Sequence, residues 1–154
     1  MAYPFFPMFV DLSEKNILVV GAGRIAARRI QTLLDFAPRL TVVAPELSVE
    51  VEALVSAGRV DLRQRGFAAG DLDGVHLVLT ATGDPAVDGE VCKLCRERGI
   101  PVNAASDKSK CDFLFPGIAH RENVVIGVTA GGEDHAAARK LTEAARGLIE
   151  DVVS

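Results

Sequence analysis

The sequence has little of what a disulfide-stabilised, membrane-spanning or nucleic-acid-binding protein requires. Its three cysteines, an odd number in 154 residues, indicate free thiols rather than a disulfide framework. No apolar run reaches the roughly 18 residues needed to cross a bilayer. The N-terminal segment lacks the basic region of a signal peptide, and a net charge of −4 without a basic stripe disfavours a nucleic-acid partner. We therefore expect a cytoplasmic protein with neither nucleic-acid nor membrane partners.

Two of the cysteines, Cys92 and Cys95, have the CxxC spacing of redox and zinc sites. They fall in the middle of a predicted helix between Pro85 and Gly99, whereas a redox motif opens its helix. Cys111 adds only a third thiol, and a structural zinc site needs four ligands. The pattern favours thiols packed beside a core, and we expect no resident metal.

The chain is long enough for one α/β core, with 49% hydrophobic and 25% charged residues. Strand-like and helix-like segments alternate, which is typical of a parallel sheet covered by helices on both faces. Strands are expected at 17–20, 40–44, 60–63, 75–81 and 101–105, with helices after the first strand, at 46–57, and from Pro85 to a stop at Gly99. The predicted order is β-α-β-α-β-β-α-β.

Residues at spacings of three and four predict two of the helices. For the first helix these are Ile25, the stem of Arg29, Thr32, Leu33 and Phe36, and for the helix after Pro85 they are Val87, Val91, Leu94 and Cys95.

After residue 105 the pattern changes from alternating strands and helices to a charged loop, two strands and one helix. The loop spans 106–112, the strands 113–119 and 124–129 would pair antiparallel across a turn at 120–123, and Asp134 or Glu133 would cap a helix running to about residue 152. We predict a Rossmann-type, mostly parallel α/β fold. Residues 1–105 would form the sheet domain, and 106–154 a loop, a strand pair and a C-terminal helix that serve as a dimerisation element.

The most specific local motif runs from Gly21 to Ala26, directly after the first apolar strand and at the start of a helix. It has the GxGxxG/A form of a dinucleotide-binding turn. Gly21 allows a tight turn, Gly23 lets the backbone approach a pyrophosphate, and Ala26 allows close packing of helix on strand. The phosphates would then meet free N–H groups at the positive end of the helix dipole.

The end of the second strand indicates which dinucleotide is bound. NAD enzymes commonly place an acid there for the ribose hydroxyls, and here Pro45 is followed by Glu46, one position late. No arginine stands at that strand end in the sequence, so a 2′-phosphate site is not indicated. The prediction is NAD rather than NADP.

Motifs along nearly the whole chain resemble the NAD-dependent precorrin-2 dehydrogenase family of sirohaem synthesis, whose module is also fused within sirohaem synthases. They lie at 3–12, 19–29, 42–46, 81–84, 102–103, 111–116, 128–132 and 138–141. The resemblance implies oxidation of precorrin-2 to sirohydrochlorin, with a hydride passing to NAD and a proton to a base. It also implies cofactor contacts at Gly21, Gly23, Arg24, Ile25, Pro45, Thr82, Asp84 and Asn103.

The resemblance implies that catalysis depends on an aspartate in the loop after Asn103. In this chain, Ser106 occupies the position of that aspartate. We predict that the next residue, Asp107, is the base and that Ser106 orients it. The alternative is that Asp107 only makes an Asx-type turn.

A second departure follows Gly131-Gly132, where the family reads x-Ser-Pro and this chain has Glu133-Asp134-His135. Precorrin-2 carries eight carboxylates, and the expected substrate contacts are Asp134, His135, Arg139 and Lys140. Of these, the two cations suit carboxylates best. His135 has the alternatives of a solvated surface residue or an approach to a metal.

The resemblance leaves three functions open. The chain is a dehydrogenase, or it also inserts iron with Asp107 and His135 as candidates, or it binds nucleotide and tetrapyrrole without catalysis. Many family members continue past the last helix, so we expect a homodimer to enclose the substrate, with a separate chelatase as a further candidate partner.

Overall fold

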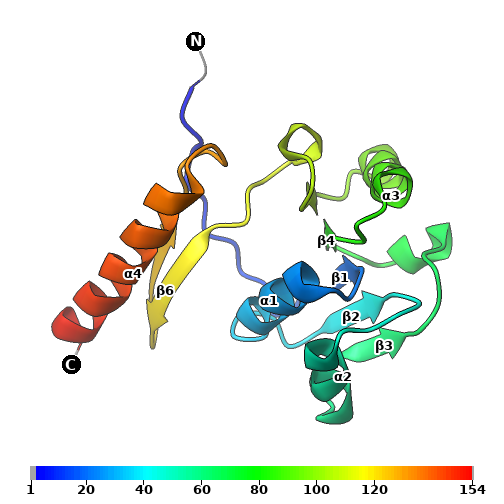
Figure 1. The fold of residues 1–154 in the computed structure, drawn as a ribbon, viewed down its shortest axis with the longest axis horizontal. Helices are drawn as coiled ribbons and strands as arrows, with labels where there is room; N and C mark the ends of the chain where they lie inside the picture. The colour runs from blue at the N-terminus through cyan, green and yellow to red at the C-terminus, as the bar shows by residue number, and fades with distance from the viewer. Residues whose placement is uncertain (1–2, 154) are drawn as a thin grey trace. The chain divides into compact units, whose positions relative to one another are not determined.

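The computed structural model describes residues 3–153, which fold as two compact units. One unit is Val10–Phe113, and the other combines Met1–Phe9 with Leu114–Ser154. Each unit is described by itself below (Figure 1). The predicted functional division after residue 105 stays a prediction, and the loop that carries Ser106 and Asp107 belongs by its contacts to the first unit.

The first unit is built on a five-stranded sheet in which all the pairs are parallel. The strands are β1 (Ile17–Val20), β2 (Leu40–Val43), β3 (Asp61–Arg63), β4 (Leu77–Thr80) and β5 (Val102–Ala104), in the order β3-β2-β1-β4-β5. The helices are α1 (Arg24–Leu33), α2 (Val49–Ser56) and α3 (Pro85–Arg98), with 3₁₀ turns η1 (Ala69–Leu72) and η2 (Lys108–Lys110). This order is the doubly wound Rossmann arrangement, and the predicted fold class is confirmed.

Each central strand buries both faces, which is why these strands read as continuous apolar runs. Leu18 and Val20 of β1 pack in one cluster with Val91, Cys92 and Cys95 of α3. Figure 1 shows α1 and α2 along one side of the sheet and α3 along the other. The central strands are therefore covered on both faces, and only their ends are accessible to a ligand.

The helix predicted after β1 is present as α1. It buries Ala26, Ala27, Ile30 and Leu33, whereas Ile25 is 54% exposed. Two alanines let the first turn lie close to the strand, which leaves the larger Ile25 outside.

The predicted face of α3 lies on the core. Val91 and Cys95 are buried, and Val87 and Leu94 are partly buried and packed against the same cluster. Cys92 is buried, as expected for a thiol beside the core, and Asp88 is the buried residue that the predicted spacing did not include. The helix thus carries a carboxyl group toward the sheet.

The second unit consists of β6 (Gly117–Arg121), β7 (Val124–Val128) and α4 (His135–Val152). The strands pair antiparallel, with Arg121 opposite Val124, and Glu122 takes the positive φ of 52° that the two-residue turn requires. The predicted antiparallel pair is confirmed, but its first strand begins at Gly117 rather than at 113, and His120 and Arg121, expected in the turn, belong to that strand. Asp134 is the cap of the last helix. Among the described residues, no helix is long and apolar enough to cross a membrane.

Candidate active site

The site is the carboxyl edge of the sheet between β1 and β4, where the chain reverses its direction of winding. In open α/β sheets ligands bind at this switch point, outside the carboxyl ends of the strands. The turn after β1 and the loop after β4 meet there. Gly21 donates its N–H to the carbonyl of Val43 at 2.9 Å, and Ala81 donates to the carbonyl of Val20 at 2.8 Å. The two loops are therefore held by the ends of the strands themselves.

Gly21 is required by its neighbours in the fold. Its φ is +106°, and a Cβ there would lie 2.3 Å from the carbonyl oxygen of Ala81 and 3.0 Å from the nitrogen of Thr82. Since both are backbone atoms, no rotamer change relieves the overlap. The tight turn predicted for Gly21 is present, and the group that demands it is the β4–α3 loop.

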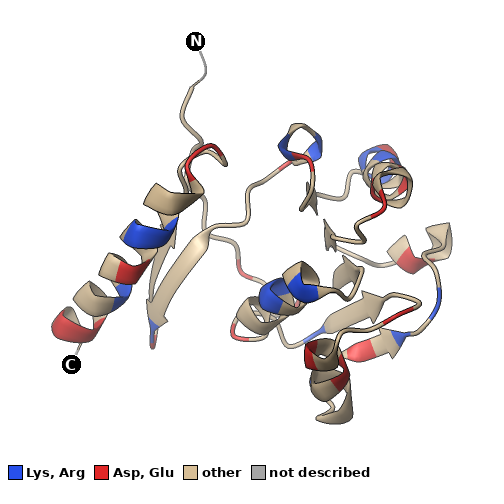
Figure 2. Ribbon diagram, viewed as in Figure 1, with Lys and Arg blue, Asp and Glu red and all other residues tan. Residues whose placement is uncertain are grey.

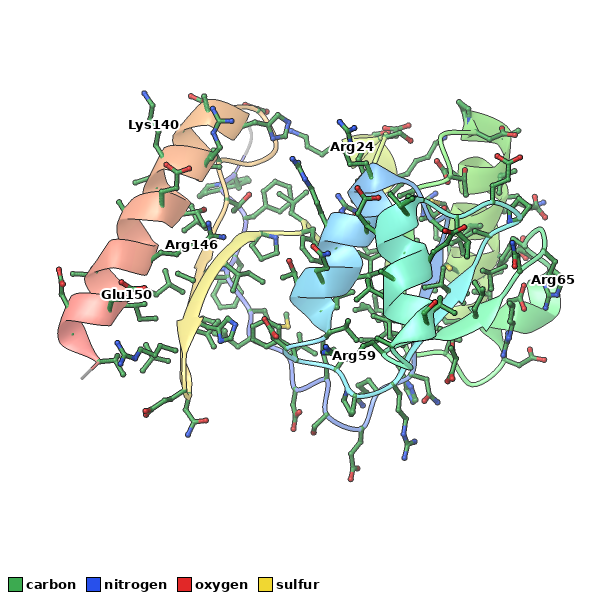
Figure 3. The ribbon with its side chains drawn as sticks, turned by 60° about the horizontal axis from the view of Figure 1, so that its bottom comes forward. Arg24, Arg59, Arg65, Lys140, Arg146 and Glu150 are labelled. Carbon is green, nitrogen blue, oxygen red and sulfur yellow. The ribbon has the colours of Figure 1, made fainter. Side chains whose placement is uncertain are left out.

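Gly23 is exposed and lies directly before α1, in an extended conformation with φ −82° and ψ −165°. Apart from Gly23 and its two chain neighbours, no described heavy atom lies within 4 Å of an ideal Cβ at this position. The open space lies over the end of the helix, where Arg24 and Ile25 are also exposed, and Figure 3 shows Arg24 at this end of α1. The glycine is therefore not explained by packing within the described chain.

The N-terminus of α1 also differs from the other described α-helices in its capping. Side chains of Ser48, Asp84 and Asp134 cap α2, α3 and α4, whereas α1 begins at Gly23 without a side-chain cap. The first turn of α1 thus has no side-chain cap, and its N–H groups and the positive end of the helix dipole suit an anionic ligand. A pyrophosphate fits this arrangement, because it needs both an unhindered approach and backbone donors.

At the end of β2, Pro45 and Glu46 are exposed, as a contact to a ribose requires. The sequence analysis missed an arginine at this edge, because it belongs to the neighbouring strand. Parallel pairing sets Arg63 opposite Val43. Its guanidinium is held by buried Asp71, at 2.7 Å.

Asp71 also receives two hydrogen bonds from Arg65, at 2.6 and 2.8 Å, and one from the N–H of Ala68 at 2.8 Å. The hydrogen bonds from Arg65 lower the pKa of Asp71, whereas burial raises it. The effect of Arg65 is the larger, so the pKa of Asp71 lies well below its usual value. Figure 3 shows Arg65 at the outer side of this unit. Both arginines of this strand end are thus engaged by one carboxylate.

The loop after β4 contains two of the predicted cofactor contacts. Asp84 caps α3 through Oδ1, which accepts from the N–H of Ala86 at 2.9 Å. The hydroxyl of Thr82 lies 2.8 Å from Oδ1 of Asp88. Both side chains have a role within the loop, and their contact with a cofactor stays a prediction.

Asn103 is buried, with both ends of its amide engaged. Its oxygen accepts from Arg29 of α1, and its nitrogen donates to the carbonyl of Phe113 at 2.8 Å. Burial lowers the pKa of Arg29 below its usual value. Asn103 therefore ties α1 to Phe113 at the far end of the loop after β5, and its contact with the nicotinamide end stays a prediction.

Asp107, the predicted base, makes the Asx-type turn given above as its alternative. Oδ1 accepts from the N–H of Ser109 at 3.0 Å and from its hydroxyl at 2.6 Å, while Oδ2 lies 3.5 Å from Nζ of Lys110. The bonds from Ser109 lower the pKa of Asp107. A carboxylate stabilised in this way is a weaker proton acceptor, although its catalytic role stays a prediction.

Asp88 is the site residue that the sequence analysis missed. Its side chain is buried at the edge of the sheet, and Oδ1 accepts from the hydroxyl of Thr80 at 2.5 Å, the hydroxyl of Thr82 at 2.8 Å and the N–H of Thr82 at 3.2 Å. Oδ2 faces the hydroxyl of Ser106 at 3.4 Å. One signal existed in the sequence, because Asp88 precedes buried Cys92 by four residues and therefore shares its helical face.

The predicted substrate contacts all lie in the second unit, at the start of α4. Asp134 accepts from the N–H of Ala137 at 2.8 Å, and His135, Arg139 and Lys140 are exposed. Basic and acidic segments alternate along α4 in Figure 2, and Lys140 points away from the helix in Figure 3. Exposure leaves these cations available to an anionic ligand, and their role stays a prediction.

The cysteines are free thiols, as expected. Cys92 and Cys95 are buried in the core beneath α3, and burial raises the pKa of Cys95 to about 12. Such a thiol is a poor nucleophile. Among the described residues, no group of three or more histidine, cysteine or acidic side chains is placed to hold a metal ion.

Comparisons with known proteins agree with this geometry. Residues 8–117 match the family described as putative NAD(P)-binding. The siroheme synthase of Pseudomonas paraeruginosa is 38% identical over 88% of this chain and 29% of its own length. Siroheme synthase 1 of Serratia proteamaculans is 36% identical over 94% of this chain and 30% of its own length. The chain therefore spans less than a third of the length of these relatives. The resemblance to this module is confirmed.

A solved structure named SirC, precorrin-2 dehydrogenase, has the same fold. The two structures superpose with a TM-score of 0.76 and 27% sequence identity. The match covers 93% of this chain and 70% of the SirC chain.

Proposed function

Since this chain belongs to the putative NAD(P)-binding family, we propose that it oxidises precorrin-2 to sirohydrochlorin with NAD as the hydride acceptor. The observation that carries the proposal is the end of α1, where an exposed glycine and an uncapped first turn leave space and donors for a pyrophosphate. The reaction class rests on the structural likeness to a precorrin-2 dehydrogenase and on the sirohaem synthase relatives.

In this proposal the described residues bind and orient while NAD supplies the redox chemistry. Gly23, Arg24 and Ile25 would contact the pyrophosphate, and Pro45 would lie near the ribose of the adenine end. Thr82, Asp84 and Asn103 would lie near the ribose and nicotinamide end of NAD, since the ends of β4 and β5 are adjacent in the sheet. Closely placed backbone donors suit a dianionic bridge, because charge-assisted hydrogen bonds are stronger than neutral ones.

NAD is preferred to NADP because the arginines near the end of β2 are already engaged. Arg63 and Arg65 both bind Asp71, so a 2′-phosphate would have to compete with an internal carboxylate. Exposed Glu46 would repel that phosphate further.

We also propose that the second unit forms a homodimer. Leu141, Leu148 and Val152 recur at spacings of seven and four along α4, which puts them on one side of the helix, and they are 57%, 58% and 70% exposed. A helix–helix contact between two copies would cover them. The L141S/L148S variant should then shift the mass measured by light scattering from dimer to monomer, whereas the E143S variant should not. An unchanged dimer in L141S/L148S contradicts this assembly.

The test of the function is an anaerobic assay of the purified chain with enzymatically made precorrin-2 and NAD. Stoichiometric NADH and sirohydrochlorin support the dehydrogenase. An iron-dependent spectral change without NAD supports iron insertion by the chain itself. Binding of both ligands without turnover leaves a non-catalytic module and overturns the proposal. A separate chelatase as partner and a cytoplasmic location remain predictions.

A further inference from the structure

Three oxygen-bearing side chains of the loop after β5 lie in different environments. Asp107 is occupied by Ser109 and Lys110. Asp112 is exposed, and its Oδ2 anchors the N–H of Val102 at 3.0 Å. Ser106 is exposed at the edge of the site, and its hydroxyl faces a buried carboxyl group.

That carboxyl group, on Asp88, has two chemically unequal oxygens. Oδ1 accepts all three bonds from Thr80 and Thr82, whereas Oδ2 has the hydroxyl of Ser106 as its one hydrogen-bond partner among the described residues. No described lysine or arginine forms an ion pair with Asp88. Three donors on one oxygen hold the side chain in a fixed orientation, with the second oxygen directed toward the site and retaining acceptor capacity.

We propose that Ser106 and Asp88 act as a proton relay, in which Ser106 meets the substrate and Asp88 receives the proton through it. The proposal rests on the proposed function. It explains how the loop works with a serine in the position where the resembling family has an aspartate: the carboxyl group is supplied by α3 and reaches the site through a hydroxyl. Asp88 is a positioning residue and the final acceptor, because its burial keeps it from touching the macrocycle.

The step balances with NAD⁺ as the oxidant. One carbon of the reduced macrocycle loses a hydride, with both electrons of its C–H bond, to NAD⁺. A proton leaves a second position of the macrocycle for Oγ of Ser106, and the hydroxyl proton of Ser106 passes to Oδ2 of Asp88. The product is two hydrogens poorer, and Asp88 later returns its proton to solvent by the reverse route. The 3.4 Å separation in the structure must shorten during this transfer.

The test compares D88N, S106A and the exchange variant D88N/S106D in the anaerobic assay, with D112N as the matched control. D88N keeps an acceptor for the threonines, and S106A changes an exposed side chain, so both should fold. We expect D88N and S106A each to lower kcat by about 100-fold with little change in KM. D112N removes an aspartate that anchors the same loop and should stay within about threefold of the wild type in kcat. The exchange variant, in which the carboxyl group is moved to the loop, should have a kcat within about tenfold of the wild-type value.

Two readouts separate the relay from a structural role. NAD affinity and melting temperature should be unchanged in S106A and in the exchange variant. An infrared difference spectrum during a single turnover should show a protonated carboxyl band that D88N lacks. Wild-type kcat in both D88N and S106A, or D88N/S106D no better than D88N, overturns the relay while leaving the dehydrogenase intact. Absence of turnover in the wild type overturns the proposed function, and the relay with it.

Discussion

Replacing Gly23 with alanine should weaken NAD binding by about 30-fold while leaving folding stability nearly unchanged. The backbone at Gly23 is extended, and beyond its two chain neighbours no described atom lies within 4 Å of the added methyl group, so the variant meets neither strain nor a clash. Loss of conformational freedom in the unfolded chain favours the alanine by about 0.4–1 kcal/mol. Alanine is a poorer N-cap than glycine by a similar amount, and the two effects offset each other.

The effect on affinity follows from the space that the methyl group takes. If the pyrophosphate lies on the first turn of α1, the methyl group displaces it from at least one backbone donor. A hydrogen bond to a charged group contributes about 2 kcal/mol, and each 1.4 kcal/mol is a factor of ten in Kd. The loss is therefore about 30-fold, measurable by titration calorimetry with NAD.

The matched variant is Gly21→Ala, for which the structure predicts the opposite pattern. Its Cβ would overlap the carbonyl of Ala81 at a φ of +106°, and strain with overpacking should cost about 3 kcal/mol of stability. Thermal unfolding of both variants separates the two glycines. Wild-type NAD affinity in a folded Gly23→Ala protein would refute the placement of the pyrophosphate at this helix end.

Two further predictions concern stability. Arg65 lowers the pKa of Asp71 below 3.8, so the ion pairs of Asp71 stabilise the fold above about pH 4 and are lost as the pH falls below that value. The D71N variant should therefore lose about 2 kcal/mol of stability at pH 7, and its urea unfolding should depend less on pH below 4. If the stability of D71N falls with pH below 4 as steeply as that of the wild type, the pairing is contradicted. In the second unit, a Cβ at Gly117 would lie 2.1 Å from Oγ1 of Thr142, so Gly117→Ala should destabilise the packing of α4 on β6 by about 2 kcal/mol. The double variant with Thr142→Ala should regain most of this stability. If the losses of the two single variants simply add in urea denaturation, the two residues do not meet.

The fold of the first unit followed from local signals in the sequence. Apolar runs predict the strands, and β1 begins and ends where expected because residues 17–20 are buried on both faces and bounded by a polar residue and a glycine. Pro85 and Gly99 bound α3 because one fixes φ for the first turn and the other takes the positive φ of 67° at its end. Such signals act within a few residues, so a single sequence contains them.

The sequence by itself also determined the dinucleotide turn, since the spacing of Gly21, Gly23 and Ala26 is a local property of one strand–helix junction. Only the tertiary structure decided which side chains share the site. Arg63 reaches the end of β2 through strand pairing, and Asp88 meets Ser106, eighteen residues later, through the packing of α3 on the sheet. Those contacts depend on how elements pack at long range and on small rotations of a helix about its axis, and a rotation by one residue exchanges a buried carboxyl group for an exposed one.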